Sequence, residues 1–233
     1  MSDHLTEEEQ LEAFKRWWKE NGKWIVAAIV IAAGGYFGWT SYQTQQQESA
    51  EAGSALYTEL LDTLAVDEGE AISDENRARA VELSEQLKAD YSDSAYGVNA
   101  ALMHARWAVD EGDLETAAGE LRWVLDQEPE AAVAQLTRLR LARVLAGQGE
   151  LDGALSVLDE ASPAQSLVSQ YAEARGDVLA ARGDNDAAAD AYQSAMESLD
   201  AQQQNRYRLL QMKLDNVRPV DVSNAPATEE NAS

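Results

Sequence analysis

The sequence predicts an all-α protein, in which a single N-terminal transmembrane helix precedes an α-solenoid of antiparallel helix pairs. Three observations predict this fold. One 19-residue stretch, 24–42, carries no charge; alanine is abundant and strand-like alternation is missing; and a glycine-centred pattern recurs at intervals of 37 and 34 residues. The chain is therefore divided into a leader (1–23), a transmembrane helix (24–42), a polar stalk (43–51), a repeat domain (52–217) and a tail expected to be disordered (218–233).

The leader is predicted to form a short amphipathic helix over residues 5–20, at the cytoplasmic surface of the membrane. Thr6 and Glu9 have the spacing of a capping box, in which each side chain bonds the free backbone N–H of the other residue. Asn21-Gly22 is expected to end this helix and act as a hinge, because glycine tolerates the left-handed conformation of a helix end. The helix is either an incidental part of a topology signal or a partner-binding surface. Its large apolar residues are Leu11, Phe14, Trp17 and Trp18.

The stretch 24–42 is long enough to cross a bilayer as a helix. It would span ~28 Å, close to the ~30 Å hydrocarbon core. A buried core helix would show a polar stripe, and this stretch is apolar all round. A cleaved signal peptide is disfavoured, because the leader is long and acidic and large aromatic residues follow the apolar run. The residues expected in the membrane include Trp24, Ile25, Val26, Ile29, Val30, Ile31, Gly34, Gly38 and Trp39.

Basic residues lie close to only one end of this span. Lys15, Arg16, Lys19 and Lys23 precede it, and the next basic residue is Arg77. Lysine and arginine near the ends of a membrane helix favour the cytoplasmic side. We therefore expect the leader in the cytoplasm and the repeat domain across the membrane.

The charge and the cysteine content of the chain limit the partners and the chemistry that can be expected. The formal charge of −24 disfavours binding to nucleic acid and to anionic lipid surfaces. The chain has no cysteine, which excludes disulfides, thiol catalysis and cysteine-bound metal.

The first part of the repeat domain follows the glycine pattern only loosely. The polar stalk is expected to stay helical and to lead into a helix over 52–66. A loop is expected over 66–74 and a second helix over 75–89. At the other end, residues 203–216 are expected to form a capping helix.

The internal repeat is centred on Gly112, Gly149 and Gly183, each followed by an acidic residue. The glycine ends the first helix of a pair, and the acid favours the N-terminus of the second. Small residues at the crossing let the helices approach, and a large residue fills the adjoining groove. These offsets and the 34-residue spacing resemble the tetratricopeptide repeat. The signature residues are Ala105, Gly112, Ala117, Leu121, Ala142, Gly149, Ala154, Leu158, Gly176, Gly183, Ala188 and Tyr192.

The residues suited to catalysis or metal binding do not form a recognisable motif. The histidines are His4 and His104, and neither belongs to an HExxH sequence or a Cys/His cluster. His104 is interpreted as a packed helix residue, and Trp107 and Trp123 as core or inter-repeat packing. The sequence therefore predicts a protein that is not an enzyme and has no cofactor.

In tetratricopeptide proteins the first helix of each pair lines a concave peptide-binding surface, so the resemblance implies such a surface here. Arg106 and Arg143 would occupy equivalent positions on it, as cations that either pair with neighbouring carboxylates or meet a ligand. Leu102 and Arg106 depart from the Lys and Asn pattern that clamps a peptide carboxylate in some repeat proteins. The candidate residues are Asn99, Leu102, Arg106, Leu136, Leu139, Arg143, Gln170, Glu173 and Asp177.

The leader QLEAFKRWWKENGKW (10–24), the GGYFGW end of the span (34–39), the stretches 97–125 and 168–196, and LLQMKLDN (209–216) resemble the YfgM family. That family is the ancillary subunit of the bacterial SecYEG translocon. The resemblance implies a single-pass inner-membrane protein with a cytoplasmic N-terminus and a periplasmic tetratricopeptide-like domain. It implies SecYEG and the membrane-anchored chaperone PpiD as partners, with translocating client chains handed on to periplasmic chaperones.

Two other functions stay open. The leader could sequester a soluble cytoplasmic signalling protein, which would make the chain an inner-membrane regulator. Alternatively, the repeat domain could be a generic scaffold of the cell envelope. Gly34 and Gly38 also have a small-xxx-small spacing that would let another transmembrane helix approach closely.

Overall fold

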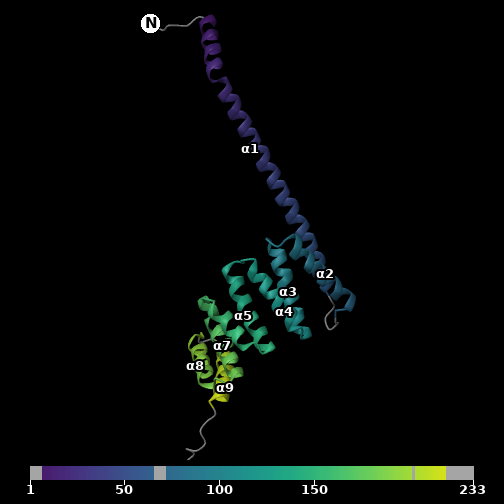
Figure 1. Cartoon of the computed structure of the whole chain (residues 1–233), viewed down its shortest axis with the longest axis vertical. Helices are drawn as coiled ribbons and strands as arrows, with labels where there is room; N and C mark the ends of the chain where they lie inside the picture. The colour runs from purple at the N-terminus through teal and green to yellow at the C-terminus, as the bar shows by residue number, and fades with distance from the viewer. Residues whose placement is uncertain (1–6, 66–71, 201–202, 219–233) are drawn as a thin grey trace, which may run out of the picture. The chain divides into compact units, whose positions relative to one another are not determined.

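The structure is a computed structural model that describes residues 7–65, 72–200 and 203–218 (Figure 1). All regular elements in these residues are helices, which confirms the all-α class. The chain divides into two compact units, and the boundary between them along the chain falls between Leu56 and Tyr57. Thr6 of the expected capping box and the tail beyond Arg218 lie outside the described residues.

Helix α1 runs without interruption from Glu7 to Leu64. The predicted helix end at Asn21-Gly22 is therefore wrong. The Asn21 side-chain amide donates to the Trp17 carbonyl at 3.1 Å, and the Trp18 ring covers Gly22 so closely that a Cβ there would meet it at 3.0 Å. Helical residues on both sides outweigh the cost of about 1 kcal/mol for a glycine inside a helix. The leader thus continues the helix of the span, and no hinge separates them.

Within α1, the stretch expected in the membrane exposes its apolar side chains. The helix is long and apolar enough to cross a bilayer, and none of its most apolar window is buried within the structure. Val26, Ile29, Val30 and Ile31 are 50–76% exposed. Such a surface is stable against lipid tails rather than water, and the helix satisfies its own backbone hydrogen bonds there.

The second unit is built from helix pairs that stack in chain order (Figure 1). Each helix contacts the next along the chain, and α9 packs against α8 at the end of the stack. The short 3-10 helix η1, Gln165–Leu167, precedes α7. The pairs are α3 (Ala95–Glu111) with α4 (Leu114–Asp126), α5 (Ala131–Gln148) with α6 (Leu151–Asp159), and α7 (Val168–Arg182) with α8 (Asn185–Glu197), followed by α9 (Gln204–Val217).

The three repeat glycines are the turning points of these pairs. Gly112, Gly149 and Gly183 have φ of 80°, 83° and 89°, a left-handed conformation that costs a glycine little and other residues about 1–2 kcal/mol. The acids that follow them differ from one another. Asp113 caps α4 by accepting the Thr116 N–H at 3.0 Å, whereas Asp184 pairs with Arg182 at 2.5 Å.

The stack is preceded by the last turns of α1 and by α2 (Asp74–Asp90). The expected separate helix over 52–66 is the end of α1, whereas α2 matches the expected helix over 75–89. Glu59 on α1 pairs with Arg79 on α2 at 2.6 Å, and Leu60 is fully buried. Ser73 caps α2 by accepting the Asn76 N–H.

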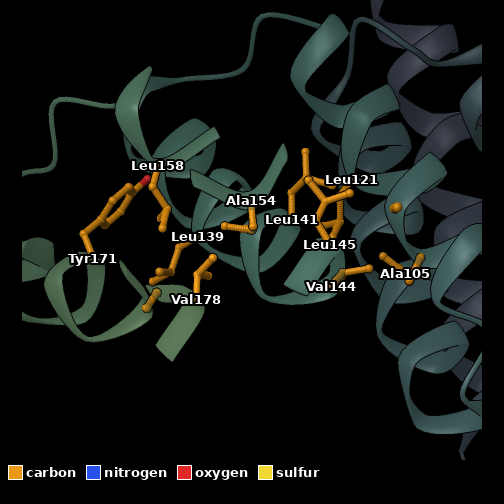
Figure 2. Packing of buried hydrophobic residues seen from close by; sticks show 14 of the residues in the cluster. Ala105, Leu121, Leu139, Leu141, Val144, Leu145, Ala154, Leu158, Tyr171 and Val178 are labelled. Carbon is orange, nitrogen blue, oxygen red and sulfur yellow. The ribbon is translucent and has the colours of Figure 1, made fainter. Parts of the chain in front are cut away.

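The core is a continuous cluster of small and branched side chains that runs along the inside of the helix pairs (Figure 2). Ala105, Ala142 and Ala154 are 0–3% exposed at the helix crossings, and Leu121 and Leu158 fill the space beside them. Alanine at a crossing lets two helices approach closely, so the abundance of alanine in the sequence reflects this packing. A second cluster around Tyr192 and Leu210 joins α8 to α9.

Candidate functional site

A cavity of about 540 Å³ lies within the repeat domain, bounded mainly by α3 and α5. Leu102, Val109 and Val144 supply apolar surface, and Leu121 of α4 lies among the lining residues. Tyr57 also lines the cavity, and its hydroxyl donates to the Met103 sulfur at 3.7 Å. The volume falls within the range of about 300–1,000 Å³ that is typical of ligand pockets.

Three arginines line this apolar cavity. Arg106 comes from α3, and Arg140 and Arg143 come from neighbouring turns of α5. The Arg106 side chain is 82% exposed, and its one carboxylate neighbour is Asp110 at 3.8 Å, among the described residues. In the described part of the chain, no carboxylate lies within 4.0 Å of Arg140 or Arg143. The lining side chains thus combine positive charge with apolar area.

The structure separates the nine residues that were expected on one binding surface. Asn99, Leu102, Arg106 and Arg143 line the arginine cavity together. Gln170 lines a different cavity of about 450 Å³, between the start of α7 and the α8–α9 connection.

The other four expected residues do not line the arginine cavity. Leu136 is 40% exposed outside it, and Leu139 is 2% exposed in the core, because it points inward from α5 (Figure 2). Glu173 and Asp177 bind side chains of α9. Arg140, which was not among the expected residues, does belong to the cavity. Arg140 lies three residues before Arg143 on the same side of α5, and this spacing is the sequence signal that could have placed it beside Arg143.

Glu173 and Asp177 form an ion-pair network that fastens α9 to α7. Lys213 on α9 donates to Glu173 at 2.8 Å and to Asp177 at 2.7 Å, and Arg206 also pairs with Glu173. Burial alone would raise the pKa of Glu173, but Lys213 and the nearby arginines outweigh it and lower that pKa. Burial and the Asp177 carboxylate together raise the pKa of the Tyr192 hydroxyl, which donates to Asp177 at 2.9 Å. Glu173 and Asp177 therefore hold α9 against α7 and do not form part of an open binding surface.

A second buried cluster joins α2, α3 and α4. The Lys88 ammonium donates to Glu85 and to the buried Glu120 carboxylate, both at 2.8 Å, and lies 5.4 Å from the centre of the Trp123 ring. His104 Nδ1 lies 3.3 Å from Glu120 without hydrogen-bond geometry. Burial alone would raise the pKa of Glu120, but His104 and Lys88 outweigh it and lower that pKa.

The same cluster brings three potential metal-ligand side chains together. The ligand atoms of Glu85, His104 and Glu120 lie within 4.8 Å of one another. The Lys88 ammonium already bonds both carboxylates, so it supplies the positive charge that a metal ion would bring. His104, with a side chain 12% exposed, packs beside Trp107 with ring centres 6.4 Å apart. We therefore interpret the cluster as structural.

Comparisons with known proteins relate almost the whole chain to one family. A family model described as a tetratricopeptide repeat-like domain matches residues 15–219. Ancillary SecYEG translocon subunits of Haemophilus influenzae and Neisseria gonorrhoeae are 32% and 34% identical to the chain, over 93% and 94% of it and 100% of each relative. The protein of the same name from Escherichia coli is 29% identical over 93% of the chain and 99% of its own length. No solved structure matches significantly.

Proposed function

The chain belongs to the family of ancillary SecYEG translocon subunits, and we propose that it is a non-enzymatic subunit that links translocated proteins to periplasmic chaperones through its tetratricopeptide-like domain. The full-length match to relatives of this name is the observation that carries the proposal. The names of the relatives indicate an accessory protein associated with the translocon. The apolar span of α1 agrees with a place in the inner membrane.

The orientation follows from the four basic residues before the span. They support an orientation with the N-terminus in the cytoplasm and the repeat domain in the periplasm. There the repeat domain can meet chains that leave the translocon, as well as the membrane-anchored chaperone PpiD. The arginine cavity is its proposed contact site, because it combines apolar surface with Arg140 and Arg143, which have no carboxylate within 4.0 Å among the described residues.

Photocrosslinking in native membranes tests this function. A photoreactive residue at Arg106 or at Arg143, both in the cavity, should label PpiD or translocating chains, and whole-protein crosslinking should recover SecY. The matched control position is Arg122, an arginine on α4 that is 52% exposed and does not line the cavity. Recovery of neither SecY nor PpiD with the protein would contradict the adaptor function. Equal labelling from Arg122 would show that the cavity is not the contact site of the adaptor function.

A second candidate function rests on the aromatic residues of the leader. Phe14, Trp17 and Trp18 are 57%, 49% and 46% exposed on α1, and their ring centres lie 6.0–6.5 Å apart. An exposed aromatic cluster of this kind is a common anchor for a protein partner. Here the leader would sequester a cytoplasmic regulatory protein. Replacement of the three residues by alanine should then abolish binding of that protein and leave association with SecY intact; unchanged binding would exclude this function.

A further inference from the structure

Two arginines of the cavity, Arg140 and Arg143, differ from most other arginines of the repeat domain in lacking a close carboxylate among the described residues. The chain has a formal charge of −24, and most arginines in the described part of the repeat domain have a carboxylate within 4.0 Å. Arginines with a carboxylate within 4.0 Å include Arg106 of the cavity itself and Arg77, Arg79, Arg122, Arg175, Arg182, Arg206 and Arg218. By contrast, Arg140 and Arg143 have none in the described part of the chain. Arg143 acts electrostatically on Glu173, but that carboxylate already bonds Lys213 and Arg206.

The spacing of the two arginines makes their lack of partners costly. Like charges three or four residues apart on one helix face repel by about 0.2–0.5 kcal/mol. Arg106 adds a third guanidinium to the same cavity from α3. None of the described residues that line the cavity is acidic. A ligand that brings carboxylates to this place would therefore relieve repulsion as well as form new ion pairs.

The surface between the arginines is apolar, and this limits the class of ligand further. Leu102 and Val144 lie within the cavity, and Val109 is 42% exposed. A small inorganic anion would leave this apolar area exposed to water. A segment with an apolar side chain beside its carboxylates would cover it and gain about 25 cal/mol for each Å² of apolar surface buried.

We propose that this cavity binds an acidic segment of a partner protein, with an apolar side chain inserted between α3 and α5 and flanking carboxylates paired with Arg140 and Arg143. This inference specifies the ligand class of the proposed adaptor site and rests on that proposed function. Arginine forks bond carboxylates through two parallel N–H···O contacts, which fixes the register of the segment. Arg106, on the facing helix, attracts the segment to the cavity.

A protein segment fits this site better than an anionic lipid. The high negative charge of the chain repels anionic membrane surfaces, so a lipid headgroup would have to approach against the field of the whole domain. A single acidic segment carries less charge than a whole anionic membrane surface, and it can enter the cavity without bringing that surface up to the acidic domain. Vesicles are nevertheless a direct competitor in the test.

The test measures binding of labelled peptides to the full chain in nanodiscs of uncharged lipid, by fluorescence anisotropy. One peptide carries a Leu-Phe pair flanked by Asp residues. A second replaces each Asp by Lys, and a third replaces the Leu-Phe pair by Ser-Ser. The variants are the double substitution Arg140→Gln and Arg143→Gln, and the control Arg122→Gln. Circular dichroism verifies that each variant keeps its helix content.

The expected result is that the acidic Leu-Phe peptide binds at least about tenfold more tightly than the other two peptides. The double substitution should weaken its binding by about tenfold, Arg122→Gln should leave it unchanged, and added salt should weaken it. Equal binding of the Lys peptide, or equal binding to the double variant, would overturn the inference. Displacement of the peptide by phosphatidylglycerol vesicles but not by phosphatidylcholine vesicles would overturn it in favour of a lipid.

Failure of this inference and failure of the adaptor function give different results. Loss of SecY and PpiD crosslinks with retained peptide binding contradicts the adaptor function and leaves the ligand class in place. Retained crosslinks without selective peptide binding contradict the ligand class alone.

Discussion

Gly176 on α7 lies directly against the ring of Tyr192 on α8, so closely that a Cβ on Gly176 would stand 2.5 Å from Cε1 of the ring. Tyr192 is 3% exposed, and its hydroxyl donates to Asp177. The ring therefore cannot move aside without losing a hydrogen bond and opening the core. This contact explains in physical terms why a glycine stands where the other repeats have Ala105 and Ala142.

Replacement of Gly176 by alanine should lower the free energy of unfolding by about 1–3 kcal/mol, because the added methyl group overpacks the α7–α8 contact. The matched control is Gly119→Ala on α4, where a Cβ meets nothing within 4 Å. That change should stabilise the protein by about 0.5–1 kcal/mol. Urea unfolding of the full chain in detergent, followed by circular dichroism, measures both; a Gly176→Ala variant as stable as the original would contradict the close packing.

The acidic residues after the repeat glycines are predicted to differ in importance. Asp113→Ala should cost about 1 kcal/mol of stability, because it removes the side-chain cap of the Thr116 N–H. Glu150→Ala should cost less than about 0.5 kcal/mol, because Glu150 makes no side-chain cap bond to α6. The same urea experiment compares them, and an equal loss for both would argue against the cap.

The sequence was sufficient for the helix pairs because their determinants are local. A glycine that must be left-handed and small residues at fixed offsets are visible in one chain, so the positions of Gly112, Gly149 and Gly183 predict where the pairs turn. The helix end expected at Asn21-Gly22 failed because the same local signal is ambiguous. A glycine also fits inside a helix when residues on both sides are helical and a ring such as that of Trp18 covers it.

The charged clusters could not be predicted, because their partners lie on different helices. Glu120 and Lys88 are 32 positions apart, and Lys213 and Glu173 are 40 apart. In so acidic a chain, sequence gives no reason to choose one carboxylate over another. The period puts Arg106, Arg143 and Asp177 at equivalent places, six residues before each repeat glycine. Only the packing shows that Asp177 is bonded by Lys213 of α9.

Glu120 should make the protein more sensitive to acid. Lys88 and Glu85 from α2 and His104 from α3 face it, and its pKa in the folded protein lies below the ordinary value. Stability from a lowered carboxyl pKa is complete above the unfolded value of about 4.3 and is lost as pH falls through the folded value. Thermal unfolding between neutral pH and acid should therefore show a stability loss that is smaller in Glu120→Gln.

At neutral pH, Glu120→Gln should be less stable than the original protein. The loss should be smaller than the value of about 3–5 kcal/mol that is typical of breaking a buried ion pair, because Lys88 keeps Glu85 as a partner. The control is Glu115→Gln, an exposed residue of the same helix, which should keep the original pH profile. A Glu120→Gln profile parallel to the original at all pH values would show that this carboxylate does not carry the acid sensitivity.

Lys213 is predicted to hold α9 in place. Lys213→Met keeps the apolar stem but removes the ammonium that bonds Glu173 and Asp177, which leaves excess negative charge beside α9. Amide hydrogen exchange in α9 should then become at least about tenfold faster. Arg208→Gln, an exposed change on the same helix, is the control and should leave exchange unaltered. Unchanged protection in Lys213→Met would mean that apolar packing of Leu210 and Val217 alone secures the helix.

Gly34 and Gly38 are predicted to form the contact surface of the span for another transmembrane helix. They lie one helical turn apart, and a Cβ on either meets nothing within 4 Å, so leucine is tolerated there by the helix itself. Leucine at both positions would hold the backbone of a neighbouring helix away and remove the close packing that drives association in lipid. Recovery of SecY by crosslinking in native membranes should fall several-fold in this double variant. The control is leucine at Ala27 and Ala28, also in the span, which should leave the recovery of SecY unchanged. Undiminished recovery from the Gly34→Leu and Gly38→Leu double variant would assign translocon binding to another part of the chain.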